Sequence, residues 1–365
     1  MISPPRRTFC VDLGSSSFAT ACVTRELLSR NWTAAPACSA QLVWLPYSKM
    51  DWNSLLAPGR RVVCGCHRVR TALVRKDALV KTAALARVNV PASGIVTLND
   101  TAESRGAAIT AAGDKGPWVV KDVVMNNALG LRFASDAGVL REAINAALAS
   151  GASRAVVQAW ETRPMLYRGS KWHARVNVAL VGKRWLYVHR DAVAHVACEP
   201  WGGGGEFNQL AEVTNNVAQR HDARYSRETH TLLVDAVVGE SHRAPLFDAI
   251  NTAIGALFDA CHAHRLAFLS LPQSFELFGF DILVRDDGVP LVLEVNGGPA
   301  LESAAWPDMC ERVVRDTVSL FADGLDMDAL GGDSDSDSDG DGDGFVSAWP
   351  HPPEPYADSG WLRIR

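Results

Sequence analysis

Residues 275–301, FELFGFDILVRDDGVPLVLEVNGGPAL, constrain the fold more than any other stretch of this chain. Two runs rich in Val, Ile, Leu and Phe flank the dipeptide Asp287-Gly288. Asp-Gly is typical of a two-residue hairpin turn, because both central residues of that turn need positive φ. We therefore predict a β-hairpin with two apolar strands.

The turn determines which residues of the two strands face each other. The expected pairs are Gly279 with Asn296, Phe280 with Val295, Asp281 with Glu294, Ile282 with Leu293 and Val284 with Leu291. Because side chains alternate along a strand, Asp281, Glu294 and Asn296 share one face and the other face is wholly apolar. Two acids embedded in an apolar hairpin need an explanation.

Directly opposed carboxylates have Cβ atoms about 5 Å apart, and like charges at that distance destabilise the strand pair unless a positive charge lies between them. Two carboxylates and an amide oxygen are hard ligands, which suits Mg²⁺ that shares its other positions with water and phosphate. We therefore expect Asp281, Glu294 and Asn296 to bind Mg²⁺. The alternative is an exposed hairpin face whose acids pair with Lys or Arg from elsewhere in the chain.

Composition limits the class of protein. Apolar residues make up 47% and charged residues 21% of the 365-residue chain, which is typical of a soluble globular protein. No apolar run approaches the roughly 20 residues that span a bilayer, and the N-terminal sequence lacks the apolar core of a signal peptide. Eight scattered Cys, with only Cys64 and Cys66 close together, indicate reduced thiols. We expect a cytoplasmic protein.

The charge is distributed unevenly. The chain has a net charge of -5, but residues 321–343 contain nine Asp and no Lys or Arg. The rest of the chain therefore balances 36 basic against 32 acidic residues. A mildly basic folded part suits a polyanionic nucleotide or an acidic protein substrate. We expect neither a nucleic acid nor a membrane as a partner.

The order of the apolar runs and of the turn-forming stretches between them predicts four segments. Residues 1–88 mix strand-like runs with the helical pattern RKDALVKTAALARV and predict a small N-terminal α/β domain. Residues 89–160 and 161–322 predict two further subdomains of strands and helices. Residues 323–365 contain the acidic run GGDSDSDSDGDGDG and predict a disordered C-terminal tail.

Three helices stand out in the two middle segments. The pattern SDAGVLREAINAALASG predicts a helix capped by Ser135 or Asp136 and ended by Gly151. Two more helices are expected near residues 246–264 and 305–322.

Two strand-like stretches carry basic side chains. Lys121 ends the run WVVK and precedes a small-residue loop, so it could hold phosphate by charge while loop amides donate hydrogen bonds. The alternative is a Lys that extends from a strand end into solvent. KWHARVNVALV places Lys171, His173 and Arg175 on one strand face, which predicts either an anion site or the solvated face of an antiparallel sheet.

Taken together, these stretches are similar to a known family. RKDAL, WVVK with its loop, VVQAWETRPML, KWHARVNV, VTNN, FELFGFDILV and LVLEVNGGPAL occur in an order that resembles the tubulin-tyrosine ligase family of the ATP-grasp superfamily. The resemblance covers residues 60–320. It implies an α/β (α+β) ATP-grasp fold with ATP between two subdomains. It also implies a ligase that joins a free amino acid to a carboxylate of an acidic protein tail, usually on tubulin, through an acyl phosphate.

The resemblance also implies roles for particular residues. Lys76 and Lys121 would contact phosphate or the base, and the backbone of Gln158–Trp160 would bind adenine. Asp281, Glu294 and Asn296 would bind Mg²⁺, with Asp281 also at the nucleotide. Lys171 and Arg175 would stabilise the transferred phosphoryl group and the acceptor carboxylate, and Thr214 and Asn215 would lie near the amino acid.

Four positions depart from the family pattern. His173 stands where the family strand usually has Asp, and His195 stands where an Arg is expected. The loop NNALG lacks the usual Arg-Gly pair, and Ala159 replaces a common Lys. Loss of an Arg removes a fixed positive charge. The alternatives are therefore a catalytically weakened ATP-grasp module that binds nucleotide or tubulin as a scaffold, and an ATP-grasp ligase acting on a small molecule.

Overall fold

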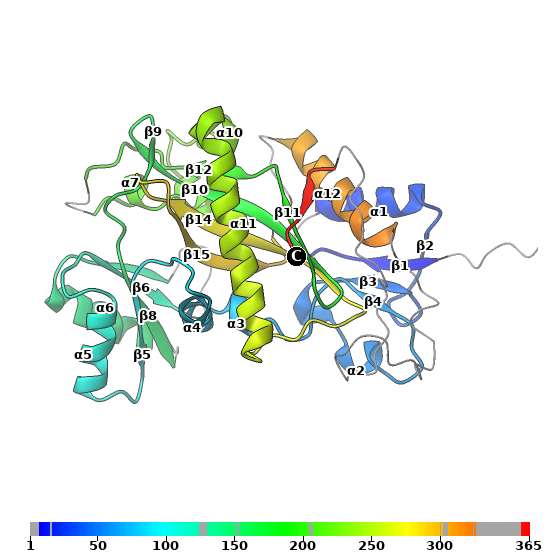
Figure 1. Cartoon of the computed structure of the whole chain (residues 1–365), viewed down its shortest axis with the longest axis horizontal. Coiled ribbons are helices and arrows are strands. Elements are labelled where there is room, and N and C mark those ends of the chain that lie inside the picture. The colour runs from blue at the N-terminus through cyan, green and yellow to red at the C-terminus, as the bar shows by residue number, and fades with distance from the viewer. Residues whose placement is uncertain are drawn as a thin grey trace, which may run out of the picture.

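The computed structural model contains three β-sheets with helices packed against them (Figure 1). It describes residues 7–14, 17–123, 130–149, 151, 153–203, 207–299, 301, 306–323, 325 and 359–365. No described helix has both the length and the apolar character needed to cross a membrane.

The first sheet is parallel and has the strand order β2-β1-β3-β4. Its elements are β1 (Thr8–Val11), α1 (Ser17–Ser29), β2 (Thr33–Ala34), β3 (Leu42–Trp44), η1 (Tyr47–Lys49), α2 (Trp52–Leu55) and β4 (Val63–Cys64). Helix α1 packs against α12 (Pro307–Ala322), which comes from the other end of the chain. The N-terminal sheet therefore shares its core with later elements, and Figure 1 shows α1 beside α12.

The second sheet is antiparallel and has the order β5-β8-β6-β7. Its elements are β5 (Ser93–Thr97), α5 (Ala102–Ala111), β6 (Trp118–Asp122), β7 (Leu131–Ala134), α6 (Ala137–Ala149) and β8 (Arg154–Ala159). Asp136 caps α6 as the sequence predicts, because its Oδ1 accepts hydrogen bonds from the N–H groups of Gly138 and Val139. Gly151, expected to end this helix, has a positive φ of 96°.

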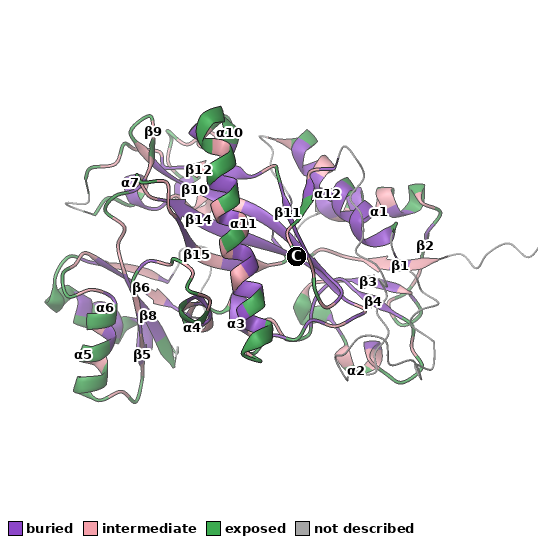
Figure 2. Cartoon of the chain, in the orientation of Figure 1, coloured by how far each residue is buried: buried purple, intermediate pink, exposed green. Residues whose placement is uncertain are grey.

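The third sheet has eight strands. They are β9 (Leu166–Tyr167), β10 (Ser170–Val181), β11 (Trp185–His189), β12 (Val193–Val196), β13 (Thr231–Leu233), β14 (Phe275–Val284), β15 (Pro290–Gly297) and β16 (Trp361–Arg363). The helices of this region are α3 (Thr71–Val74), α4 (Lys76–Ala86), α7 (Gln209–Glu212), α8 (Asn216–Gln219), α9 (Arg227–His230), α10 (Val234–Val238), α11 (Glu240–Ala263) and α12. Helix α11 crosses one face of this sheet, and its buried side faces the strands (Figure 2). It begins six residues before the predicted helix at 246–264.

Strand β10 explains why this sheet holds a site. Its even-numbered residues from Trp172 to Leu180 are buried in the core beneath α11. The odd-numbered residues Lys171, His173, Arg175 and Asn177 are polar, whereas Ala179 and Val181 on the same face join the core that includes α12. One face of a single strand therefore changes from polar to apolar, and the polar half faces a cavity.

The hairpin differs from the prediction in two places. Arg285 N–H donates to Val289 O and Gly288 has a φ of 81°, so the loop comprises three residues, 286–288, instead of the expected two. The pairs nearest the turn are therefore shifted, and Ile282 pairs with Val292 instead of Leu293. A bulge at Leu293 then restores the predicted register, so that Asp281 lies opposite Glu294.

The end of the chain also differs from the prediction of a tail that runs to Arg365. Strand β16 pairs with β11, Trp361 is only 2% exposed, and Gly360 N–H donates to Asp316 on α12. The last residues therefore belong to the third sheet (Figure 1). The acidic run that motivated the tail prediction lies outside the described residues.

Candidate active site

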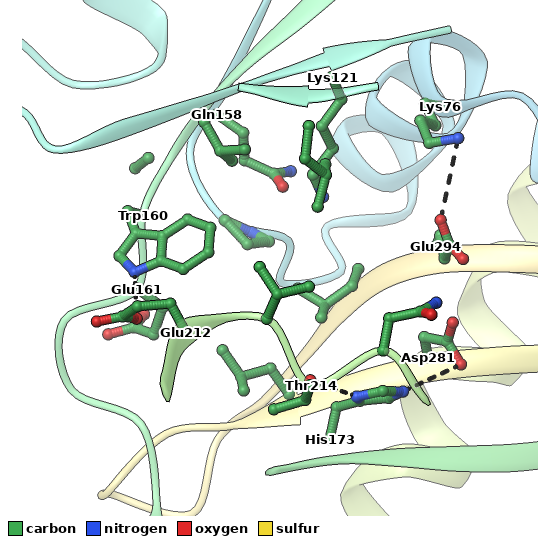
Figure 3. Close-up of a pocket in the computed structure, with 18 of the residues that line it drawn as sticks. Lys76, Lys121, Gln158, Trp160, Glu161, His173, Glu212, Thr214, Asp281 and Glu294 are labelled. Atoms are coloured by element: carbon green, nitrogen blue, oxygen red, sulfur yellow. Dashed lines mark hydrogen bonds and ion pairs between the residues drawn. The ribbon is translucent and has the colours of Figure 1, made fainter. Parts of the chain in front are cut away.

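A central pocket lies between the second and third sheets. It is formed by β6, β8 and α4 on one side and by β10, β14 and β15 on the other (Figure 3). Nine predicted site residues line it: Lys76, Lys121, Gln158, Trp160, Lys171, Thr214, Asn215, Asp281 and Glu294. Figure 3 shows Trp160 and Glu212 at one end, which we call the base end because residues predicted to bind adenine lie there. Lys76, Glu294 and Asp281 lie at the other end, which we call the acid end because of its two carboxylates.

The two hairpin acids meet at the acid end as predicted. The Asn296 side-chain amide donates to both, at 3.3 Å to Asp281 Oδ2 and 3.2 Å to Glu294 Oε1. Arg175 makes a two-pronged ion pair with Asp281, with Nη2 3.0 Å from Oδ2, and Lys76 Nζ lies 4.0 Å from Glu294 Oε2. The carboxylates therefore have cationic neighbours within the chain, as the alternative to a metal site predicts, but Asp281 is buried and does not lie on the exposed face of that alternative.

The same donor set can accommodate one type of metal site. In the described part of the chain, no three His, Cys, Asp or Glu side chains are arranged to hold a metal together. Mg²⁺ in phosphate-transfer sites is bound by one or two carboxylates and takes its other ligands from phosphate and water. Asp281 and Glu294 fit that shared arrangement, and Asn296 would add its Oδ1 only after its amide turned, because its Nδ2 now faces both acids. They do not fit a metal cage made by protein alone.

Two lysines face the acid end from the opposite side. Burial lowers the pKa of Lys121 to about 8, and the nearby carboxylate of Glu294 opposes this shift while Lys76 adds to it. Among the described residues, Lys121 makes no side-chain hydrogen bond or ion pair. Its ammonium group is therefore directed at the cavity with its donors available to an anionic ligand.

Lys171 lies at the base end, and the structure separates it from Arg175. Its Nζ donates to Glu212 Oε2 at 2.5 Å and to Glu161 O at 3.1 Å, and it lies 4.6 Å from the centre of the Trp160 ring. Four residues of strand separate Lys171 from Arg175, which is about 13 Å. The two side chains predicted to act together thus lie far apart: Lys171 is at the base end, and Arg175 lies beyond the acid end, where it pairs with Asp281.

Gln158 and Trp160 are held by the surrounding protein. Gln158 Nε2 donates to Ser93 Oγ, and Trp160 Nε1 donates to Glu212 Oε2. The backbone N–H groups of Ala159 and Trp160 donate to carbonyls in neighbouring segments. Two N–H groups of the Gln158–Trp160 backbone, the stretch predicted to bind adenine, are therefore already occupied.

The two unusual histidines lie side by side, with ring centres 5.0 Å apart. His173 Nδ1 is 2.6 Å from Thr214 Oγ1, which ties β10 to the segment before α8. Burial and, to a smaller extent, the charge of Arg175 lower the pKa of His173 to about 3. Burial and the neighbouring His173 place the pKa of His195 well below its usual range. Both imidazoles are neutral at pH 7, so neither supplies a fixed charge.

Three residues at the site were missed from the sequence. Glu212 anchors both Lys171 and Trp160, and its one signal is an acid in an otherwise apolar stretch just before Thr214. Phe133 and Phe207 stack on each other at 4.6 Å beside Trp160. No sequence pattern joins these aromatic residues, because Phe133 is on β7, Trp160 follows β8 and Phe207 precedes α7.

The fold and the site define a class of enzyme fold. The C-terminal domain of K. lactis Pby1, described as an ATP-grasp enzyme interacting with the mRNA decapping enzyme Dcp2, matches with a TM-score of 0.69. The match covers 99% of this chain and 98% of that chain at 18% identity. The chain therefore has the ATP-grasp fold, which confirms the sequence prediction.

The sequence comparisons define the family. The model of the tubulin-tyrosine ligase family matches residues 70–328, and the chain belongs to this family. A probable tubulin polyglutamylase of Homo sapiens is 27% identical over 183 residues, covering 45% of this chain and 30% of the relative. A tubulin monoglycylase of Homo sapiens is 24% identical over 234 residues, covering 59% and 30%. The chain spans about a third of the length of these relatives.

Proposed function

We propose that this protein is an ATP-dependent ligase that joins a free amino acid to a carboxylate of a protein acceptor, with an acidic tubulin tail as the first candidate. The observation that carries the proposal is the acid end of the central pocket. There, two opposed carboxylates on β14 and β15 face the ammonium groups of Lys76 and Lys121. This mixture of acids and cations suits a metal-bound polyphosphate.

The residues divide into three groups along the pocket. Asp281, Glu294 and Asn296 would bind Mg²⁺, which supplies positive charge at the phosphates of bound ATP. Lys76 and Lys121 would contact phosphate oxygens. Trp160 and Lys171 would contact the base, so we assign Lys171 to nucleotide binding and no longer to the transferred phosphoryl group.

The reaction proceeds in two steps. An oxygen of the acceptor carboxylate attacks the γ-phosphorus of ATP, the bond from that phosphorus to the β,γ-bridging oxygen breaks, and ADP leaves. The neutral amine of the amino acid then attacks the acyl carbon, the bond from that carbon to the phosphate oxygen breaks, and phosphate leaves as the nitrogen loses a proton. Arg175 lies beside Asp281 at the acid end, where its guanidinium group would stabilise the charge on the transferred phosphoryl group.

Mass spectrometry tests the proposal directly. The protein is incubated with ATP, Mg²⁺, tubulin and a pool of isotope-labelled amino acids, and the acceptor peptides are then examined for added mass. A labelled residue linked to an acceptor carboxylate, formed only with ATP, is expected. Hydrolysis of ATP without transfer to any protein acceptor would contradict the proposed reaction.

A scaffold that binds nucleotide without turnover is the second candidate. Because the two histidines are neutral, Arg175 has no second fixed cation beside it, and Arg175 is itself paired with Asp281. Less positive charge is then available to stabilise a transferred phosphoryl group, which favours the scaffold. Calorimetric binding of Mg·ATP, combined with no ADP release in the presence of tubulin and all amino acids, would favour the scaffold.

A further inference from the structure

A second pocket adjoins the acid end of the central pocket. It lies between β10, β12, the start of α8 and the first turns of α12. His173 and Asn215 line both pockets, and Arg175 lines the second pocket while pairing with Asp281 of the first. A molecule in the second pocket would therefore lie beside the end of the central pocket to which we assign the reacting phosphate.

Much of the wall of the second pocket is apolar. Val193, Leu301, Met309, Cys310 and Val313 contribute side chains that are all at least nine-tenths buried. A surface of this kind stabilises an apolar group by removing it from water. It does not replace the hydration that a charged group loses on burial.

The polar wall of the second pocket is neutral. His195 Nδ1 and Asn216 Oδ1 are buried and, among the described residues, neither makes a hydrogen bond of good geometry, although the Asn216 side chain lies close enough to His195 to raise its pKa. Buried polar atoms without partners are uncommon in folded proteins, and a ligand that pairs with them recovers the cost of their desolvation. Asn177 and Thr231 add further uncharged hydrogen-bonding groups.

The number of fixed charges restricts the ligand. Among the described residues that line the second pocket, Arg175 is the one Lys, Arg, Asp or Glu, and it is also paired with Asp281. An amino acid brings an α-carboxylate, which Arg175 can meet. The described part of this lining offers no other fixed cation to a second carboxylate, and His195 is neutral. An acidic side chain would be desolvated there without a partner.

We propose that the second pocket binds the amino acid co-substrate and selects an uncharged, largely apolar side chain over an acidic or basic one. This inference rests on the proposed ligase function and adds the class of amino acid. The polar atoms of His195 and Asn216 hold the backbone end of the amino acid, and the wall from α12 contacts its side chain. Discrimination against a buried unpaired carboxylate is stronger than discrimination between apolar side chains of similar size.

Calorimetry measures this selectivity without turnover. The full chain is first titrated with Mg²⁺ and a non-hydrolysable ATP analogue, and the saturated complex is then titrated with glycine, alanine, leucine, phenylalanine, glutamate and lysine in turn. At least one neutral amino acid is expected to bind, and glutamate and lysine are expected to bind at least tenfold more weakly. Glutamate binding as tight as the best neutral amino acid would overturn the inference.

A charge-adding variant tests the role of the second pocket. His195→Arg places a fixed cation in the wall, and it should raise affinity for glutamate at least tenfold while lowering affinity for the preferred neutral amino acid. His264→Arg is the matched control, because it makes the same substitution at an exposed position at the end of α11 and should leave the preference unchanged. Equal behaviour of the two variants would place the amino acid elsewhere.

The two proposals fail in different ways. If the ATP analogue does not bind, the proposed ligase function is overturned and this inference falls with it. If the analogue binds but no amino acid binds, or glutamate binds best, the assignment of the second pocket is overturned and nucleotide binding stands.

Discussion

At the scale of single residues, Asp281 is the most constrained group of the site. It accepts from Arg175 and Asn296, lies opposite Glu294 in the hairpin, and has His173 Nε2 3.7 Å from its Oδ1. Within the protein, Arg175 and Lys76 offset the repulsion between the two opposed acids. Binding of Mg²⁺ at this end would therefore compete with protein cations for the same carboxylates.

The first prediction concerns Glu294. Glu294→Gln removes a ligand charge and also relieves repulsion with Asp281, so Mg²⁺-dependent ATP affinity should fall and turnover should be abolished while the protein stays folded. ATP titrations with and without Mg²⁺, together with thermal melts, measure both effects. Asp286→Asn, in the exposed hairpin loop, is the control and should change neither. Unchanged Mg·ATP affinity in Glu294→Gln would remove this residue from the metal site.

The second prediction concerns Arg175. Its charge matters most when the phosphoryl group is in transit, so Arg175→Ala should lower turnover by roughly 10²- to 10³-fold and change nucleotide affinity much less. Arg175→Lys keeps the charge but loses the planar fork that pairs with Asp281, and we expect an intermediate loss. Steady-state kinetics and analogue binding separate the two effects. Small, equal losses in both would place Arg175 outside the reaction centre.

The third prediction concerns pH. The pKa of His173 falls from 6.5 in the unfolded chain to about 3 in the folded chain, and the pKa of His195 is also well below 6.5. The unfolded state therefore binds more protons below pH 6.5, so the free energy of unfolding should decrease as pH falls from 6.5 toward 3. Denaturant titrations at several pH values measure the slope. His195→Gln should have a shallower slope, and a slope equal to that of the exposed control His264→Gln would contradict the assignment.

At the scale of elements, the hairpin shows what the sequence could and could not determine. The alternation of apolar and polar residues correctly predicted that Asp281 lies opposite Glu294. It could not predict the loop of three residues, because Asp286-Asp287-Gly288 suits that loop as well as Asp-Gly suits a two-residue turn. It also missed the bulge, since an extra residue in a strand leaves no mark on composition.

The polar residues of β10 show a similar limit. The sequence placed Lys171, His173 and Arg175 on one face, and the structure confirms that the two pockets together have all three in their walls. The function of each could not be predicted, because a strand extends about 3.3 Å per residue, so Lys171 lines the central pocket and Arg175 lines the second pocket. Contacts such as that between Lys171 and Glu212 join residues 41 positions apart, which no local pattern reveals.

The fourth prediction follows from the bulge. Ile282 is fully buried in the core, whereas Leu293, at the bulge, lines the central pocket beside Glu294. Ile282→Ala should therefore lower the free energy of unfolding by about 2–5 kcal/mol. Leu293→Ala should cost less stability but weaken nucleotide binding. Chemical denaturation and analogue titration of both variants measure the contrast, and equal losses of stability with unchanged binding would contradict it.

At the scale of the whole molecule, the two ends of the chain share one core. Phe9 of β1 and Leu27 of α1 pack in the same cluster as Val313 and Phe321 of α12 and Trp361 of β16. The predicted division at residue 88 therefore does not separate independent cores. The last strand could not be predicted from the sequence, because WLR is too short to show the alternation of polar and apolar residues that is typical of a strand. It also follows a long acidic stretch.

The fifth prediction tests how strongly β16 stabilises this shared core. Trp361 is 2% exposed and its ring lies edge-on to His189 at 4.8 Å, while its neighbour Leu362 is 46% exposed. Trp361→Ala leaves a large cavity between β16 and the sheet and should lower the free energy of unfolding by about 3–5 kcal/mol. Leu362→Ala, in the same strand, should change it by no more than about 0.5 kcal/mol. Urea denaturation compares the two variants, and similar small values for both would show that the C-terminal strand contributes little to the folded state.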